Sequence, residues 1–224
     1  AVLYALQQED HLIAQVGDPE YYKVCGAMFT CGSAFDWSDG AVHLGKPDIE
    51  KAKQLLKEGG YKGEPVVILS PSDLKTLTAL GPVTAQALRR IGMNVELLSM
   101  DWQTVVSRRA KMEPPAQGGW SIFHSAWGNF DLTDPVSNAG INGLGRKGFF
   151  GWPEDAEMEA LRDRFARETD PAKQKAIAAA IHKRAYDLVF YIPLGEYEVP
   201  FAYRSNIAGI LDAPAPALWN IEKK

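Results

Sequence analysis

The sequence has little cysteine, no excess of basic residues and no long apolar run. Its formal net charge is −4 and its pI is about 5.6. It therefore lacks the concentrated basic charge that binding to a phosphate backbone needs, and we expect no nucleic-acid partner. The longest apolar runs fall far short of the roughly 20 residues that a membrane-spanning helix requires.

Metal-binding patterns are also missing. Cys25 and Cys31 are the only cysteines, and a CxxxxxC spacing without a second cysteine pair or a clustered histidine is not a zinc signature. The histidines are scattered along the chain at His11, His43, His124 and His182. We expect no metal site and no cofactor. The two cysteines fit either a local disulfide in an oxidising compartment or a pair of buried free thiols, and the sequence leaves both open.

Catalytic signatures are absent too, since the chain contains neither G-x-S-x-G nor HExxH and no cysteine–histidine context. Asp131 and Asp134 invite an acid–base hypothesis, and a hydrolase acting on peptides is the enzymatic alternative. General acid–base catalysis needs carboxyls with separated pKa values across a substrate, which neighbours in one turn rarely supply. We therefore expect no catalytic residues and a protein that is not an enzyme.

A literal G-x-G-x-x-G occurs at Gly143, Gly145 and Gly148. As a nucleotide fingerprint this motif must lie between a buried strand and a helix whose N-terminal amides hold the pyrophosphate. Here SNAGIN precedes it and FFGWP follows it, so we interpret it as a loop.

With 224 residues, 46% of them hydrophobic, the chain can bury the core of one large α/β domain. Residues 1–16 have the pattern of the middle of an amphipathic helix, without Met, cap or leader, so we expect a fragment. Hydrophobic periodicity predicts further helices at 48–58, 76–91, 102–111, 154–167 and 170–188, and strands at 65–69, 94–100, 120–126 and 190–197. The order strand, helix, strand over 65–100 predicts parallel pairing. Residues 21–45 are expected to form an irregular loop.

The stretch from Gly118 to Asn138 is the most informative. A predicted apolar strand is followed here by turn-forming residues, so Trp127 and Asp131 lie at its C-terminal end. Ligands bind at this edge of open α/β sheets. The alternative is a packing Trp beside an Asx-turn, and spacing alone does not exclude it.

The string W(127)-GNF-D(131)-LT-D(134)-P(135) resembles the ligand-contacting segment of solute-binding protein family 5, the peptide/nickel class of ABC importer receptors. In its peptide-binding members an Asp four residues before a Pro pairs with the ligand's α-amino group, which implies that role for Asp131. The gap from Trp127 to Asp131 is one residue longer than usual. The resemblance implies ligand contacts from this stretch at Trp127, Asn129, Phe130, Asp131 and Asp134.

Three further motifs resemble the same family in the same order: DIEKAKQLLKEGGY, LRRIGMNVELLSMDW, and a helix pair followed by IPL. The resemblance implies the second lobe of a type II-like periplasmic binding protein, with a mixed, mostly parallel sheet flanked by helices. Residues 1–206 would form this lobe, and 207–224 would return to a missing N-terminal lobe.

The function implied is capture of di- or oligopeptides by two-lobe closure and delivery to an ABC permease in the inner membrane. The protein would be periplasmic or lipid-anchored. A nickel complex, a sugar, an opine or haem are alternative ligands, and a pure interaction module is an alternative of another class.

Overall fold

The run PVVIL forms the centre of the main sheet because its β-branched residues tolerate burial on both faces. The computed structural model of the protein describes residues 1–37, 45–211, 213 and 217–224, so His43 and parts of the predicted 21–45 loop and of the 207–224 tail lie outside the described residues. Strand β2 (Val66–Pro71) lies between β3 (Val95–Met100) and β4 (Ile122–Phe123), and both pair with it in parallel. The predicted parallel unit is therefore confirmed.

Helices cover the two faces of this sheet. Ile68 packs with Ala85 and Leu88 of α5 (Leu80–Arg90) on one face. Val67 and Leu69 pack with Val105 of α6 (Trp102–Arg108) on the other. Since successive side chains of a strand point to opposite faces, the uninterrupted apolar run of β2 is explained by burial on both sides.

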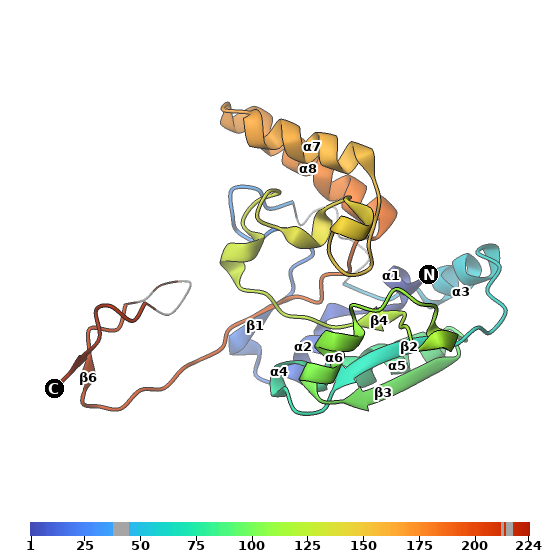
Figure 1. The fold of residues 1–224 in the computed structure, drawn as a ribbon, viewed down its shortest axis with the longest axis horizontal. Helices are drawn as coiled ribbons and strands as arrows, with labels where there is room; N and C mark the ends of the chain where they lie inside the picture. Colours follow the sequence, from blue (N-terminus) through green and yellow to red (C-terminus); the bar gives the residue numbers. More distant parts are fainter. Residues whose placement is uncertain (38–44, 212, 214–216) are drawn as a thin grey trace.

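The remaining elements are arranged around this layer (Figure 1). They are α1 (Val2–Ala5), α2 (Gln8–Gln15), β1 (Tyr22–Lys23), α3 (Ile49–Glu58), α4 (Lys75–Thr78), α7 (Ala156–Arg167), α8 (Pro171–Leu188), β5 (Glu196–Tyr197), β6 (Ile207–Ala208) and β7 (Glu222–Lys223). Strands β1 and β5 pair antiparallel, as do β6 and β7. Among the described residues no helix combines the length and apolarity needed to cross a membrane.

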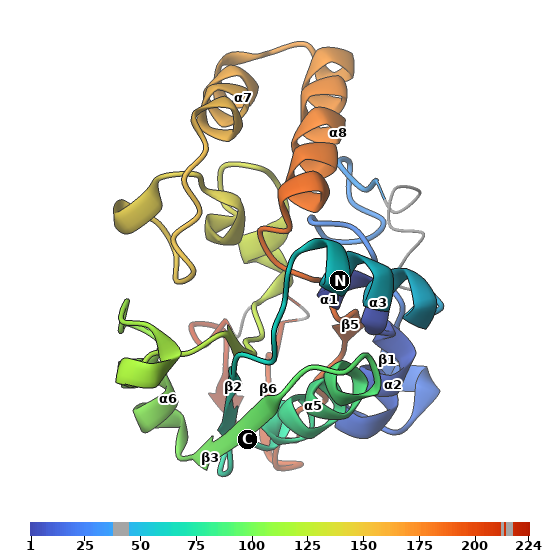
Figure 2. The same ribbon diagram turned by 90° about the vertical axis from the view of Figure 1, so that its right-hand side faces the viewer.

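Helices α7 and α8 form a second tier above the sheet (Figure 2). Their core contains Met158, Phe165 and Ile181, and Met28 and Phe29 of the loop after β1 complete it. The predicted caps are present in this tier: Asp170 accepts from the Lys173 amide, and Pro171 occupies the first helical position of α8. The cap of α7 is Asp155, so that helix begins two residues later than predicted.

The predicted helices 1–16 and 76–91 are each divided. Leu6 and Gln7 adopt extended backbone between α1 and α2. In the second case Ala79 separates α4 from α5. Pro82 lies in the first turn of α5 and has no amide hydrogen to donate back to α4, which explains the interruption. Helix α6 ends at Arg108, three residues before the predicted end.

Two predicted strands are much shorter than expected. The 120–126 strand reduces to β4, which is half-buried rather than buried. After Phe123 the chain turns His124 into the interior, and pairing stops. The 190–197 strand reduces to β5. Pro193 has no amide hydrogen to donate to a neighbouring strand. Gly195 adopts a φ of 105°, which lies outside the range of β-strand residues, so the strand cannot extend through these positions.

The chain after β5 extends away from both tiers and ends in the β6–β7 hairpin (Figure 1). Its large apolar side chains are exposed at Val199, Phe201, Tyr203, Leu218 and Trp219.

A buried polar chain links α2, α5 and the end of β4. His11 Nδ1 lies 2.7 Å from the Gln7 carbonyl oxygen, which assigns the ring hydrogen to Nδ1. His11 Nε2 then accepts from the Thr84 hydroxyl at 2.9 Å, and Thr84 Oγ1 accepts from His124 Nε2 at 2.8 Å. The bond at His11 Nε2 requires a neutral His11 ring, because that nitrogen must accept the hydroxyl hydrogen. Burial, with repulsion from His11 second, lowers the pKa of His124 from 6.5 to about 3.

We predict that acid destabilises this protein well above the ordinary carboxyl range. Burial also lowers the pKa of His182 from 6.5 to about 4. The unfolded chain binds protons at these histidines below about pH 6.5 whereas the fold does not, so stability is lost as pH falls from 6.5 towards 4 for His182 and towards 3 for His124. Between its folded and unfolded pKa values, each histidine lowers the free energy of unfolding by about 1.4 kcal/mol for every unit by which the pH falls. Urea unfolding at pH 6 and pH 5 measures this slope. The His124→Gln variant is expected to be less stable than the wild type, but its free energy of unfolding should fall less between pH 6 and pH 5, because one buried histidine is gone. The same fall in both proteins would contradict a neutral, buried His124.

Candidate ligand-binding site

The segment after β4 folds into a tight turn. Gly128 leads into a 3₁₀ helix at Asn129–Leu132, and the Asp131 amide donates to the Gly128 carbonyl at 2.9 Å. A side chain at Gly128 would bring its Cβ to 2.8 Å from the Phe130 ring and 3.5 Å from Asp131 Oδ2. The absence of a side chain here leaves room beside the Asp131 carboxylate.

A cleft of about 270 Å³ lies at the carboxyl edge of the parallel sheet. It is lined by Trp102, Arg109, Ser125, Ala126, Trp127, Gly128, Asp131 and Phe149. Trp102 and Arg109 belong to the helix region after β3, and the residues from Ser125 to Asp131 follow β4. The segments that follow β3 and β4, the two strands on either side of β2, therefore build the cleft, at the edge where ligands bind in open α/β sheets.

The structure brings two of the five predicted contact residues, Trp127 and Asp131, into this cleft. Asp131 is partly exposed, and within the described ranges no hydrogen bond or ion pair reaches its carboxylate. Both oxygens are thus free to accept from a ligand. This carboxylate differs from a capping Asp, whose oxygens are occupied by nearby amides.

Asp134 is such a capping residue. Its Oδ1 accepts from the Val136 amide at 2.7 Å and from the Ser137 amide at 3.0 Å. Asn129 and Phe130 also lie outside the cleft lining. The Asn129 carbonyl accepts from the Thr30 hydroxyl at 3.0 Å, and Phe130 is 51% exposed. The structure therefore does not group these three side chains with Trp127 and Asp131.

Arg109 lines the same cleft and was not among the residues expected from the sequence. Its guanidinium carbon lies 4.5 Å from the ring centroid of Phe150 and 5.6 Å from those of Phe123 and Trp102. Burial lowers the pKa of Arg109 from its ordinary value, but an arginine remains charged at neutral pH. Its Nε is buried and has no hydrogen-bond partner in the part of the chain that the structure describes. The spacing of seven between Trp102 and Arg109, two helical turns, is the one signal that would have placed both on one face.

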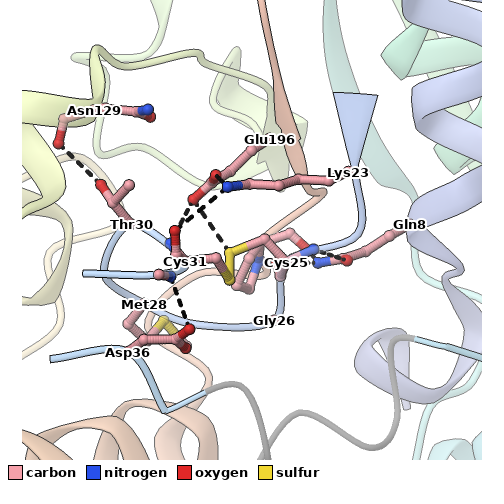
Figure 3. Close-up of a disulfide and its surroundings, with 12 residues drawn as sticks. Gln8, Lys23, Cys25, Gly26, Met28, Thr30, Cys31, Asp36, Asn129 and Glu196 are labelled. Carbon is pink, nitrogen blue, oxygen red and sulfur yellow. Dashed lines mark hydrogen bonds and ion pairs between the residues drawn. A yellow bond between two sulfur atoms is a disulfide. The ribbon is translucent and has the colours of Figure 1, made fainter. Parts of the chain in front are cut away.

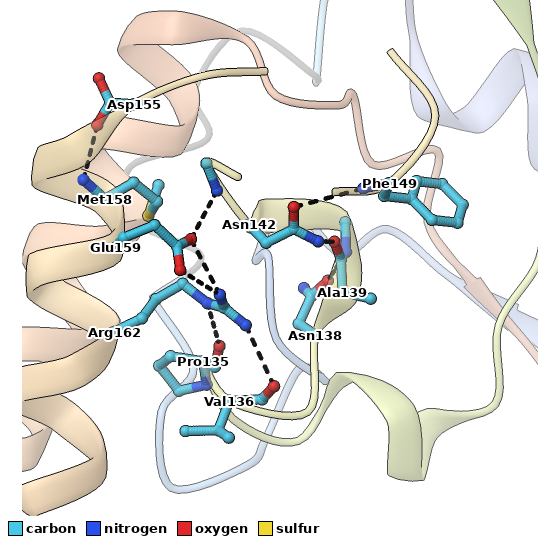
Figure 4. Close-up of polar contacts among 12 residues, drawn as sticks. Pro135, Val136, Asn138, Ala139, Asn142, Phe149, Asp155, Met158, Glu159 and Arg162 are labelled. Carbon is cyan, nitrogen blue, oxygen red and sulfur yellow. Dashed lines mark hydrogen bonds and ion pairs between the residues drawn. The ribbon is translucent and has the colours of Figure 1, made fainter. Parts of the chain in front are cut away.

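Aromatic rings form the rest of the wall. Trp127 and Phe149 meet edge to face at 5.0 Å, and Phe149 lies 5.1 Å from Phe150. The Phe149 amide donates to Asn142 Oδ1 at 3.3 Å (Figure 4). A Cβ on Gly148 would lie 2.0 Å from that same oxygen. Gly148 is thus required for close approach to Asn142, which agrees with interpreting the G-x-G-x-x-G motif as a structural loop.

Helix α7 holds the backbone that follows the Asn129–Leu132 turn. The Arg162 guanidinium donates to the Pro135 carbonyl at 2.9 Å and to the Val136 carbonyl at 3.3 Å (Figure 4). Glu159 fixes Arg162 with two bonds of 3.0 and 3.1 Å and accepts from the Gly143 amide at 2.6 Å. The helix tier therefore positions backbone of the turn and leaves the Asp131 side chain untouched.

Cys25 and Cys31 form a disulfide with an S–S distance of 2.01 Å (Figure 3). This is one of the two alternatives that the sequence left open. Cys25, Cys31 and Glu196 also form a cluster of metal-ligand types, but in the disulfide neither sulfur is a thiolate.

A separate groove of about 370 Å³ lies between α2 and α5, lined by Asp10, Ile13, Ala14, Val83, Gln86, Ala87 and Arg90. None of the sequence-predicted contact residues borders it. The cleft at Trp127 and Asp131 is accordingly the candidate site.

Comparison with known proteins agrees with this architecture. Residues 20–148 match the family described as "Bacterial extracellular solute-binding proteins, family 5 Middle". A curated relative in Sinorhizobium fredii, named a probable peptide ABC transporter periplasmic-binding protein, is 37% identical over 225 residues. That alignment covers all of this chain and 42% of the relative, so the chain spans about two fifths of its length.

Solved structures share the fold at low sequence identity. The agropinic acid complex of the binding protein AgaA from A. tumefaciens R10 is 20% identical with a TM-score of 0.79, covering 100% of this chain and 46% of that one. A dipeptide-binding protein from Pseudoalteromonas sp. SM9913, in complex with Met-Leu, is 18% identical with a TM-score of 0.74, covering 100% and 44%. The match over residues 20–148 and the 37% identity to the curated relative establish that the chain belongs to family 5 of the bacterial extracellular solute-binding proteins.

Proposed function

We propose that this chain is the ligand-gripping part of an ABC transporter's substrate-binding protein that captures di- or oligopeptides. The observation that carries the proposal is that the Asp131 carboxylate, which has no partner among the described residues, borders one cleft with Trp127 and with Arg109, whose guanidinium lies over three aromatic rings. The name of the Sinorhizobium fredii relative, a peptide ABC transporter periplasmic-binding protein, supports the same class of ligand.

Asp131 would bind the α-ammonium group of the peptide. Its two free oxygens accept charge-assisted hydrogen bonds, each worth about 1.5 to 3 kcal/mol. Trp127, edge to face on Phe149, gives a flat apolar wall for the residue that follows. Neither group requires a particular peptide side chain, so the site suits sequence-tolerant capture.

Arg109 supplies the opposite charge. Its Nε lacks a partner among the described residues, and a guanidinium offers planar donors that match a carboxylate. The rings of Phe150, Phe123 and Trp102 keep it partly dry, which strengthens its attraction to an anion. A cleft with one carboxylate and one guanidinium fits a zwitterion, and an acid without an ammonium group would use Arg109 alone.

The same proposal covers the wider protein. Residues 1–206 would form one lobe of a two-lobed receptor, and 207–224 would return to the other lobe. The exposed Leu218 and Trp219 of that segment would then be covered. Closure on the peptide and delivery to an inner-membrane permease would take place in the periplasm, or outside the cell on a lipid anchor, with no catalytic step.

We predict that Asp131→Asn weakens binding of free-amino alanine peptides of two to five residues by about 10- to 100-fold, because the charge of the acceptor is lost. N-acetylated peptides should bind weakly and equally to both proteins. Titration calorimetry on the full-length protein measures this. Asp134→Asn is the matched control, since it removes the same charge three residues away while an asparagine oxygen can still cap the turn, and it should bind like the wild type. Unchanged affinity in Asp131→Asn would remove Asp131 from the site.

We predict that Arg109→Gln weakens the same peptides by about 10-fold, which corresponds to one charged hydrogen bond of about 1.5 kcal/mol. Carboxy-terminally amidated peptides should show no such loss, because they present no carboxylate. Arg108→Gln is the matched control: Arg108 precedes Arg109, donates to the Gly118 carbonyl at 3.2 Å and lies outside the cleft lining. Equal losses in the two variants would contradict a specific role for Arg109.

A further inference from the structure

Thr30 holds the turn that carries Asp131 at both of its ends. Its amide donates to the Leu132 carbonyl at 3.0 Å, and its hydroxyl donates to the Asn129 carbonyl at 3.0 Å. These carbonyls belong to the first and last residues of the 3₁₀ helix Asn129–Leu132. Figure 3 shows Thr30 reaching Asn129 directly beside Cys31. A residue distant in sequence thus brackets Asp131 without touching its carboxylate.

The Cys25–Cys31 disulfide closes the loop around Thr30 into a covalent ring, and both ends of this ring are hydrogen-bonded to other parts of the protein. The buried Gln8 exchanges two hydrogen bonds with the Cys25 backbone, of 2.6 and 2.9 Å. At the other end the Cys31 amide donates to Glu196 Oε1 at 2.7 Å, and Lys23 pairs with Glu196 at 2.9 Å (Figure 3). The Cys25–Cys31 disulfide joins the two anchored ends over a sequence separation of 6.

The turn has few other supports near Asp131. Within it the Asp131 amide donates to the Gly128 carbonyl at 2.9 Å, and the Thr133 hydroxyl to the Phe130 carbonyl at 3.3 Å. Arg162 acts further along, at Pro135 and Val136. The direction in which Asp131 leaves the turn therefore depends on Thr30.

We propose that Thr30 is a positioning residue for Asp131, and that the Cys25–Cys31 disulfide makes ligand affinity depend on redox state. The inference rests on the proposed function. A dithiol reductant transfers two electrons and two protons to the disulfide, which becomes two thiols while the dithiol becomes a disulfide. Opening the ring gives the loop more conformations. Thr30 then brackets the turn for a smaller fraction of the time, and fewer molecules present Asp131 to the ligand, which weakens the apparent affinity.

The test compares Thr30→Val with Thr30→Ser in the full-length protein, using the free-amino alanine peptides of two to five residues in calorimetry. Valine keeps the shape and the backbone amide but loses the hydroxyl, so affinity should fall about 5-fold, as expected for one neutral hydrogen bond. Serine keeps the hydroxyl and should bind within about 2-fold of the wild type. A merely structural effect of valine would not be rescued in this way.

The coupling to Asp131 separates the two proposals. In an Asp131→Asn background, Thr30→Val should cause no further loss, because the charge that it positions is gone. If Asp131→Asn binds like the wild type, the proposed function and the role of Thr30 both fail. If Asp131→Asn weakens binding and Thr30→Val causes no loss, or the same loss in both backgrounds, the positioning role alone is wrong.

The redox arm uses Cys25→Ser/Cys31→Ser and the wild type treated with dithiothreitol. Both should bind the peptides about 5- to 10-fold more weakly than the oxidised protein, with an unchanged circular dichroism spectrum and no further loss in the Asp131→Asn background. If the double variant does not fold, the test is the peptide affinity of the reduced wild type, measured where its circular dichroism signal equals that of the oxidised protein. Equal affinity of its oxidised and reduced forms would overturn the redox dependence.

Discussion

Among the described residues the Asp131 carboxylate has no hydrogen-bond or ion-pair partner, and the side chains that hold its turn bond to backbone carbonyls instead. Thr30 bonds the Asn129 and Leu132 carbonyls, and Arg162 bonds those of Pro135 and Val136. A partly buried carboxylate normally gains partners from its own protein, since an unsatisfied charge is costly. Here the supporting residues satisfy the carbonyls of the turn instead, so the charge is left for an incoming group.

This arrangement explains why parts far apart in the sequence meet at one sheet edge. The parallel sheet places the ends of β3 and β4 at the same edge, on either side of β2, so that Arg109 and the Trp127 segment border one cleft. The disulfide loop and α7 then reach the turn from the helix tier, and Met28 and Phe29 anchor that loop in the α7–α8 core. The sheet fixes where the site is, whereas the second tier fixes its shape.

Sequence patterns identified the features that depend on local order. Strands β2 and β3 were predictable because two runs of strand-forming residues lie on either side of an amphipathic helix. The position of Asp131 at the edge of the sheet was predictable because it follows the end of the next strand. Asp134 shows the limit. The local sequence does not distinguish a capping Asp from one whose carboxylate is left without a protein partner, and only the hydrogen bonds from the Val136 and Ser137 amides identify Asp134 as the cap. Arg109 escaped prediction because the rings around it come from Trp102, Phe123 and Phe150, which meet only in the fold.

The separation of Asp131 and Arg109 has an electrostatic consequence. Among the described residues no ion pair joins the two groups, although they border one cleft. A direct pair would neutralise both charges and would have to be broken, at the cost of leaving each charge desolvated, before a ligand could bind. The aromatic cage holds the guanidinium through the faces of its rings, so no carboxylate is needed to keep it in place. In the proposed two-lobed receptor, closure would remove water and strengthen both contacts with the ligand, and a guest that supplies both complementary charges would stabilise the closed state more than a guest that supplies one.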